Sequence, residues 1–118
     1  MARDVFKEVD EALGEPLFKL MCDGPEDELV LTRNAQPALM AVSLAVVRVL
    51  EAESGKKLQE LFDSVAGHSL GEYSALAAVN SISLSETAKL LRLRGESMQK
   101  AVPLGEGAMA ALLGADMD

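Results

Sequence analysis

The first third of the chain carries apolar residues at helical spacing. Apolar positions recur every four residues from Val5 to Leu13 with charged residues between them, which predicts an amphipathic helix over residues 3–13 that ends at Gly14. Residues 16–21 favour a second short helix. The acidic stretch 25–28 favours the first turn of another short helical piece, because carboxylates are stabilised at the positive end of a helix dipole.

The next segment, residues 37–50, is apolar on nearly all sides. Asn34 is a suitable N-cap for a helix here, with Pro37 still inside the first turn, and the helix should end before Gly55. A helix that is apolar all round is buried on most sides. Lys56 then begins a polar connection.

Two short apolar runs, residues 62–66 and 107–113, predict buried strands. Helical spacing returns between them over residues 70–79 and 84–101, and a capping box, Ser83-x-x-Glu86, opens the second of these helices. Two parallel strands alone leave apolar surface uncovered, so the chain resembles part of an α/β domain. The predicted organisation is helical over 1–54, strand-turn-helix over 62–79, helix over 84–101 and strand over 107–113.

Composition narrows the functional classes. The 118 residues are 49% hydrophobic and 25% charged, which is too apolar for a disordered chain. A net charge of −8 and the lack of a basic stripe with aromatic residues argue against nucleic-acid binding. We expect no apolar stretch long enough to span a bilayer and no signal segment. Cys22 is the single cysteine, which excludes an internal disulfide and a multi-cysteine metal site and fits a reducing compartment.

The pentapeptide Gly67-His-Ser-Leu-Gly71 matches G-x-S-x-G between a predicted strand and a predicted helix. In such a nucleophile elbow the glycines allow a sharp turn that pushes the hydroxyl of Ser69 outward. The backbone N–H of Leu70, at the start of the next helix, is then placed to stabilise an oxyanion. The competing interpretation is a tight turn that happens to contain serine.

A second signal comes from the helix over residues 84–101. At about 100° per residue, Arg94 shares its side of the helix with Thr87, Leu90, Leu91, Met98 and Ala101. Arg92 falls on the opposite side, beside Lys89 and Lys100. We therefore expect Arg94 to point inward and Arg92 to face solvent. A buried guanidinium needs a partner, which is either a group on another helix or a substrate carboxylate that matches its planar fork.

A serine nucleophile and an inward arginine together suggest transfer of an acyl group that carries a second, free carboxylate. Two alternatives remain at this point. A serine esterase acting on neutral substrates would need the elbow but not Arg94. A non-catalytic chain that only packs against a missing remainder of its domain would explain the incomplete sheet.

Longer motifs around these residues carry a resemblance. Gly67-His-Ser-Leu-Gly-Glu-Tyr-Ser-Ala-Leu76, Leu91-Arg-Leu-Arg-Gly95, Met98-Gln99, Ala101-Val-Pro103, Gly107-Ala-Met-Ala-Ala-Leu-Leu-Gly114 and Asn34-Ala-Gln-Pro-Ala38 resemble the malonyl-CoA:acyl-carrier-protein transacylases of type II fatty-acid synthesis. The resemblance extends over nearly the whole chain. It implies an incomplete α/β-hydrolase-like large subdomain of an acyltransferase, rich in helices with a short parallel sheet, and without the family's ferredoxin-like subdomain.

The resemblance also implies roles for individual residues. Ser69 would be malonylated by malonyl-CoA, and the pantetheine thiol of acyl carrier protein would then take the malonyl group. Arg94 would bind the malonyl carboxylate, Gln36 would line the same pocket and hold the arginine, and Leu70 would supply one oxyanion donor. No cofactor and no metal are expected, and the reaction would be cytoplasmic.

Two departures from the family pattern affect these expectations. The family begins with a strand and a Gly-Gln-Gly-Ser-Gln loop that supplies the other oxyanion contact, and neither is found in this sequence. The family's catalytic histidine lies further along its domain than Asp118. His68, the single histidine, should point away from the Ser69 hydroxyl because neighbouring side chains diverge on a sharp turn, so we expect it to pack or to support the substrate site.

Overall fold

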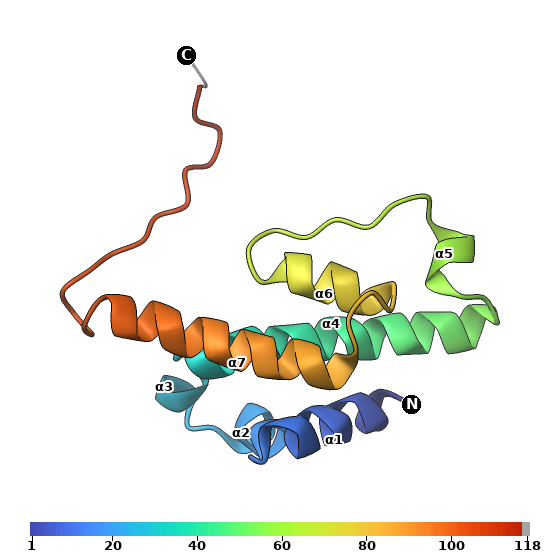
Figure 1. Ribbon diagram of the computed structural model, residues 1–118, viewed down its shortest axis with the longest axis horizontal. Helices are drawn as coiled ribbons and strands as arrows, with labels where there is room; N and C mark the ends of the chain where they lie inside the picture. Colours follow the sequence, from blue (N-terminus) through green and yellow to red (C-terminus); the bar gives the residue numbers. More distant parts are fainter. Residues whose placement is uncertain (117–118) are drawn as a thin grey trace.

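The computed structural model describes residues 1–116 and forms a layered arrangement of helices (Figure 1). Seven helices lie in this part of the chain: α1 (Ala2–Leu13), α2 (Leu17–Asp23), α3 (Glu26–Leu29), α4 (Thr32–Ser54), α5 (Leu58–Leu61), α6 (Gly71–Ala78) and α7 (Leu84–Ala101). The predicted helices are therefore confirmed within a few residues at their ends. The short helix α5 is new, because a single turn in a polar connection gives no periodic signal.

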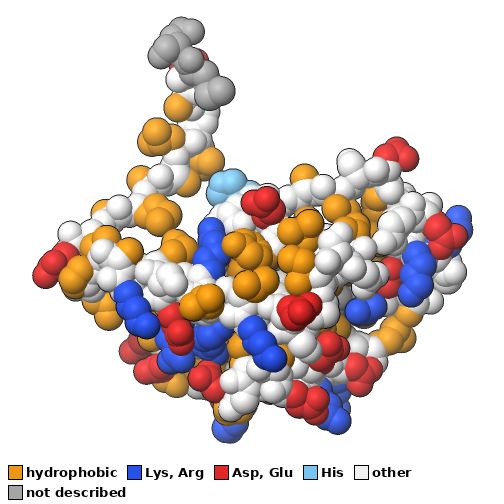
Figure 2. All heavy atoms as spheres, in the orientation of Figure 1, with side chains coloured by type: hydrophobic (Ala, Val, Ile, Leu, Met, Phe, Trp, Pro, Cys, Tyr) orange, Lys and Arg blue, Asp and Glu red, His pale blue; other side chains and the backbone are white. Residues whose placement is uncertain are grey.

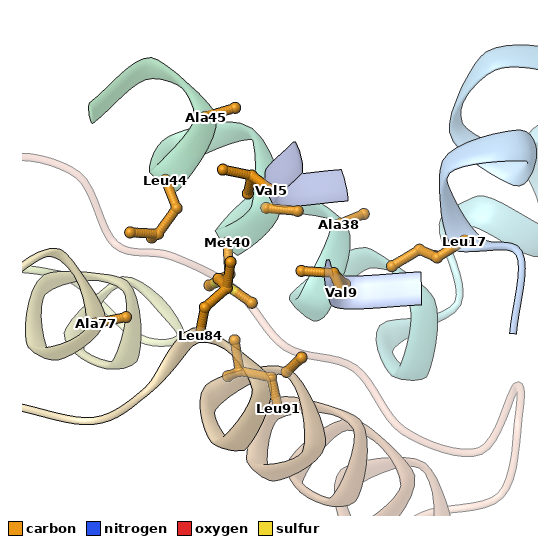
Figure 3. Packing of buried hydrophobic residues seen from close by; sticks show 12 residues of the cluster. Val5, Val9, Leu17, Ala38, Met40, Leu44, Ala45, Ala77, Leu84 and Leu91 are labelled. Carbon is orange, nitrogen blue, oxygen red and sulfur yellow. The ribbon is translucent and has the colours of Figure 1, made fainter. Parts of the chain in front are cut away.

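The hydrophobic core forms around α4, which contacts α1, α2, α3, α6 and α7. Its apolar residues Met40, Ala41 and Leu44 are almost completely buried, and they meet Val9 of α1 and Leu91 of α7 (Figure 3). The core thus joins segments from both ends of the chain, and it holds α7 in a fixed position beside α4.

By length and composition alone, α4 is also apolar enough to cross a membrane, so the expectation that no stretch reaches this length is wrong. Its packing is that of a core helix on one side only, because Leu39, Val42 and Val46 of α4 are exposed, so the expectation that this helix is buried on most sides is wrong. It contributes eight buried residues and lies between α1, α6 and α7.

The start of α4 differs from the prediction in its cap. The helix begins at Thr32, and the side chain of Asn34, instead of capping it, donates a hydrogen bond to the carbonyl of Glu28 at 2.8 Å. Pro37 therefore lies inside the helix and has no N–H to donate to the carbonyl of Arg33 four residues earlier. Nη1 of Arg92 donates to that carbonyl at 2.8 Å instead, so a side chain of α7 completes the first turns of α4.

The two predicted strands, 62–66 and 107–113, do not form, and residues 1–116 contain no strand. A strand needs a neighbour to pair its backbone N–H and C=O groups, and these two segments do not pair with each other. Both are exposed, and Figure 2 shows hydrophobic side chains along the segment that follows α7. The most exposed of them are Leu104, Met109, Leu112 and Leu113.

The orientation of α7 also corrects the prediction. The expectation that Arg92 faces solvent is wrong: this residue is only 9% exposed. The buried face of α7 centres on Leu91 and Gly95, and Arg92 and Arg94 leave the helix about 160° apart, near opposite edges of that face. Leu90 and Met98, expected to be inward with Arg94, are exposed.

Candidate active site

Ser69 occupies a strained turn immediately before α6. Its φ of 56° is in the left-handed region, which residues with a side chain seldom adopt. Gly67 makes this turn possible, because a Cβ there would lie 1.9 Å from the carbonyl oxygen of Gly71. Gly71 itself has open space where a Cβ would be, so only the first glycine of the motif is sterically required. Such strain is typical of a nucleophile elbow and leaves the Ser69 side chain exposed.

The turn leads directly into the N-terminus of α6. Leu70 is the N-cap residue of this helix, and its backbone N–H has no hydrogen-bond acceptor within residues 1–116. Free N–H groups at a helix start carry partial positive charge and bind anions. The amide next to Ser69 is therefore available to stabilise negative charge that develops on an acyl oxygen.

Arg94 reaches this turn from the middle of α7. Its Nη2 donates a long hydrogen bond to Oγ of Ser69 at 3.4 Å, and its Nη1 donates to Oε1 of Gln36 at 2.6 Å. The guanidinium carbon also lies 5.8 Å from the centre of the Tyr73 ring, within the range of a cation–π contact. The turn before α6 and the helices α4 and α7 thus bring Ser69, Gln36 and Arg94 together at one surface site.

The amide of Gln36 is held from its other side. The residue is 4% exposed, and its Nε2 donates to Oγ1 of Thr32 at 2.6 Å and lies 3.3 Å from Sδ of Met98. Every polar atom of this amide therefore has a partner, as buried amides require. The guanidinium of Arg94 is held by a fixed side chain, not by a mobile one.

Arg92 fixes the surrounding backbone. In addition to the Arg33 carbonyl, its Nη1 donates to Oδ1 of Asn34 at 2.6 Å, and its Nη2 pairs with Oε2 of Glu15 at 2.7 Å. Burial lowers the pKa of Arg92 below its usual value, while the charge of Glu15 opposes that shift. A guanidinium remains protonated at neutral pH in spite of such a shift. Arg92 is therefore a structural cation that joins the start of α4 to α7.

Some sequence expectations fall outside this arrangement. The side chain of His68 is exposed, so it does not pack, and no hydrogen bond joins it to Ser69 in the part of the chain described. Thr32 and Tyr73 also belong to this arrangement, although neither was predicted from the sequence. Thr32 could have been found from spacing, because it lies one helical turn before Gln36. The contact of Tyr73 is with Arg94 on another helix, so it leaves no local signal in the sequence.

The comparisons with known proteins agree with this geometry. The sequence profile of the acyl transferase domain family matches residues 1–117. The chain belongs to the acyl transferase domain family. Within it, the chain is 49% identical over 117 residues to the malonyl CoA-acyl carrier protein transacylase of Bacillus subtilis strain 168, covering 99% of this chain but 35% of that protein. The resemblance that the motifs indicated is therefore confirmed.

Solved structures of acyl transferases show the same fold for this part of the domain. The acyl-carrier-protein-S-malonyltransferase from Bartonella henselae has a TM-score of 0.89 at 59% identity, over 98% of this chain and 37% of that one. A malonyl-transacylase in complex with its type II PKS acyl-carrier protein has a TM-score of 0.75 at 42% identity, over 86% of this chain and 32% of that one. The chain thus spans about a third of the length of these relatives.

Proposed function

We propose that this chain supplies the nucleophile and the carboxylate receptor of a malonyl transfer reaction, from malonyl-CoA to the pantetheine thiol of acyl carrier protein. The observation that carries the proposal is the 3.4 Å contact between Oγ of Ser69 and Nη2 of Arg94. A malonyl group carries its thioester carbonyl and its free carboxylate one carbon apart. Neighbouring serine and guanidinium groups suit its two ends.

The chemistry follows from the residues around Ser69. Its Oγ attacks the thioester carbonyl, the N–H of Leu70 and the positive end of α6 stabilise the oxyanion, and the C–S bond breaks to release CoA as the thiol. The pantetheine thiol of acyl carrier protein then attacks the malonyl-serine ester and restores the hydroxyl. These substrates need no further cofactor, and we place the reaction in the cytoplasm, with which the single free cysteine, Cys22, is compatible.

Arg94 gives the reaction its selectivity in this proposal. Its planar guanidinium binds a carboxylate with two parallel hydrogen bonds, which an acyl group without a carboxylate cannot accept. Support comes from the relatives named malonyl CoA-acyl carrier protein transacylase and from the relative solved with its acyl-carrier protein. A generic esterase would have no use for a guanidinium beside its serine.

Two further parts of the proposal concern the base that takes the proton of Ser69 and the two segments that were predicted to be strands. Ser69 needs a base, and His68 does not contact it, so we infer that the base is the histidine which the family carries further along its domain. We infer likewise that residues 62–66 and 107–113 become strands of an α/β-hydrolase-like sheet when a neighbouring segment pairs with them. Their apolar, exposed side chains, such as Val65 and Leu112, support this inference.

The experiment is to incubate the chain with malonyl-CoA or acetyl-CoA and to measure the intact mass and the modified residue by mass spectrometry. We expect a malonyl adduct on Ser69 that forms slowly, because no base contacts this hydroxyl within residues 1–116, but faster than the acetyl adduct, and none in Ser69→Ala. Ser85→Ala is the matched control, because it removes another serine hydroxyl, one on α7 that donates a hydrogen bond to Oε1 of Glu8 on α1. Equal rates for the two thioesters would favour the esterase interpretation. Absence of any adduct even at alkaline pH, where hydroxide can take the proton without a histidine, would favour a chain that only packs with a partner segment.

A further inference from the structure

The oxygen and the NH2 group of the Gln36 amide need different hydrogen-bond partners. The oxygen meets the guanidinium of Arg94, whose Nη1 lies 2.6 Å from Oε1. A guanidinium has only donors, so the amide must present its oxygen to Arg94. The NH2 group of the amide therefore points away from Arg94, into a buried position where it needs an acceptor.

Thr32 provides that acceptor. Its Oγ1 lies 2.6 Å from Nε2 of Gln36, one helical turn earlier on α4. The other neighbour, Sδ of Met98, lies at 3.3 Å, and a thioether is a weak acceptor. Without the hydroxyl, the amide would gain by rotating away from the orientation that Arg94 requires, because a buried, unpaired N–H is unfavourable.

The position of Thr32 is itself fixed against α7. A Cβ on Gly95 would lie 2.6 Å from the carbonyl oxygen of Thr32, so the backbones of α4 and α7 are in direct contact there. Arg92 holds the next residue through its hydrogen bond to the carbonyl of Arg33. Thr32 thus lies on a turn of α4 whose backbone is held against α7, so its hydroxyl has a fixed position from which to bind the amide of Gln36.

We propose that Thr32 is a positioning residue for the carboxylate receptor: its hydroxyl orients the amide of Gln36, and the amide orients the guanidinium of Arg94 toward Ser69. Thr32 contacts neither Arg94 nor Ser69 directly among its hydrogen bonds, and it acts through Gln36. The effect on selectivity rests on the function proposed above. The effect on the orientation of the amide does not.

The test compares Thr32→Val, which keeps the shape but removes the acceptor, with Thr32→Ser, which keeps the acceptor. The ratio of malonyl to acetyl labelling on Ser69 should fall about five- to tenfold in Thr32→Val, the size expected for one buried hydrogen bond. Thr32→Ser should restore it. Met98→Leu, which removes only the weak sulfur acceptor, should change the ratio by less than Thr32→Val, and Thr32→Ala serves if the valine variant does not fold.

A second measurement separates this proposal from the proposed function. The side-chain NH2 of Gln36 gives NMR signals whose shift and solvent exchange report its hydrogen bond, and both should change in Thr32→Val but not in Thr32→Ser. If the parent chain shows no malonyl preference, the proposed function fails and the NMR result alone decides the role of Thr32. Unchanged Gln36 signals in Thr32→Val, or an unchanged labelling ratio while Gln36→Ala lowers it, would overturn the proposal.

Discussion

Nη2 of Arg94 donates a hydrogen bond to Oγ of Ser69 at 3.4 Å, although the two residues lie on different elements and 25 positions apart. The hydroxyl and the guanidinium therefore share one site before any substrate is bound. A carboxylate is a much stronger acceptor for Arg94 than a neutral hydroxyl. Binding of a diacid would replace this long contact and release Ser69 for attack on the other end of the same molecule.

Replacing the guanidinium should change selectivity more than reactivity. In Arg94→Met, the rate of malonyl labelling of Ser69 should fall by roughly 10- to 100-fold relative to acetyl labelling, because hydrogen bonds to charged groups contribute about 1.5–3 kcal/mol. Arg94→Lys keeps the charge but loses the planar fork, so it should give an intermediate ratio. Competition between the two thioesters, read by mass spectrometry, measures this ratio. A parallel loss of both labels in Arg94→Met would contradict a carboxylate receptor.

The two glycines of the elbow should respond differently to alanine. A Cβ on Gly67 would lie 1.9 Å from the carbonyl oxygen of Gly71, so Gly67→Ala must move the backbone and should lower the free energy of unfolding by about 2–4 kcal/mol. A Cβ on Gly71 would lie in open space on the first turn of α6, so Gly71→Ala should raise the free energy of unfolding by about 0.5–1 kcal/mol. Urea denaturation of the two variants measures the difference. Similar losses in both would show that the motif is not held by the contact described here.

Gly95 should matter for the site as well as for stability. A Cβ there would lie 2.6 Å from Cα of Arg33, so Gly95→Ala should separate α7 from α4. The free energy of unfolding should fall by about 1–3 kcal/mol. The malonyl preference should fall with it, because Arg94 would move away from Gln36. Ser97→Ala, an exposed change on the same helix, should stay within about 0.5 kcal/mol of the parent in urea denaturation. A Gly95→Ala chain that is destabilised but keeps its labelling ratio would separate the packing from the site.

Local sequence signals were sufficient to predict the helices and the turn that carries Ser69. Glycines, apolar spacing and the Ser83 cap act within a few residues, so they define α1 and α7 directly from the sequence. The start of α4 was placed less well, because Asn34 binds the carbonyl of Glu28 instead of capping the helix. The strands failed because a strand needs a partner that local sequence does not supply, and apolar runs alone cannot show whether one is present.

Arg92 and Arg94 of α7 show where helical periodicity fails to predict burial. Averaging the apolar positions placed the buried face on Arg94, whereas burial centres on Leu91 and Gly95. An analysis by helical periodicity gives glycine no weight and places arginine on the exposed side. In the structure, Gly95 marks the closest helix contact and Arg92 is buried because Pro37 leaves a carbonyl without a partner. Only the three-dimensional contact between α4 and α7 contains that information.

Arg92 should therefore be the more important arginine for stability. Arg92→Met removes the donor to the carbonyl of Arg33 and to Asn34, which is 5% exposed, so the unfolding free energy should fall by about 2–4 kcal/mol. Glu15 is 46% exposed and can be solvated when its partner is lost, so the loss comes mainly from the two oxygens on α4. Arg33→Met is the matched control: its contacts to Glu15 and Glu96, at 3.4 and 3.5 Å, are long and partly open to solvent, so they should be worth less than about 1 kcal/mol. Urea denaturation of both variants measures these losses, and an Arg33→Met loss as large as that of Arg92→Met would place the energy in the surface charges instead of in the carbonyl that Pro37 leaves free.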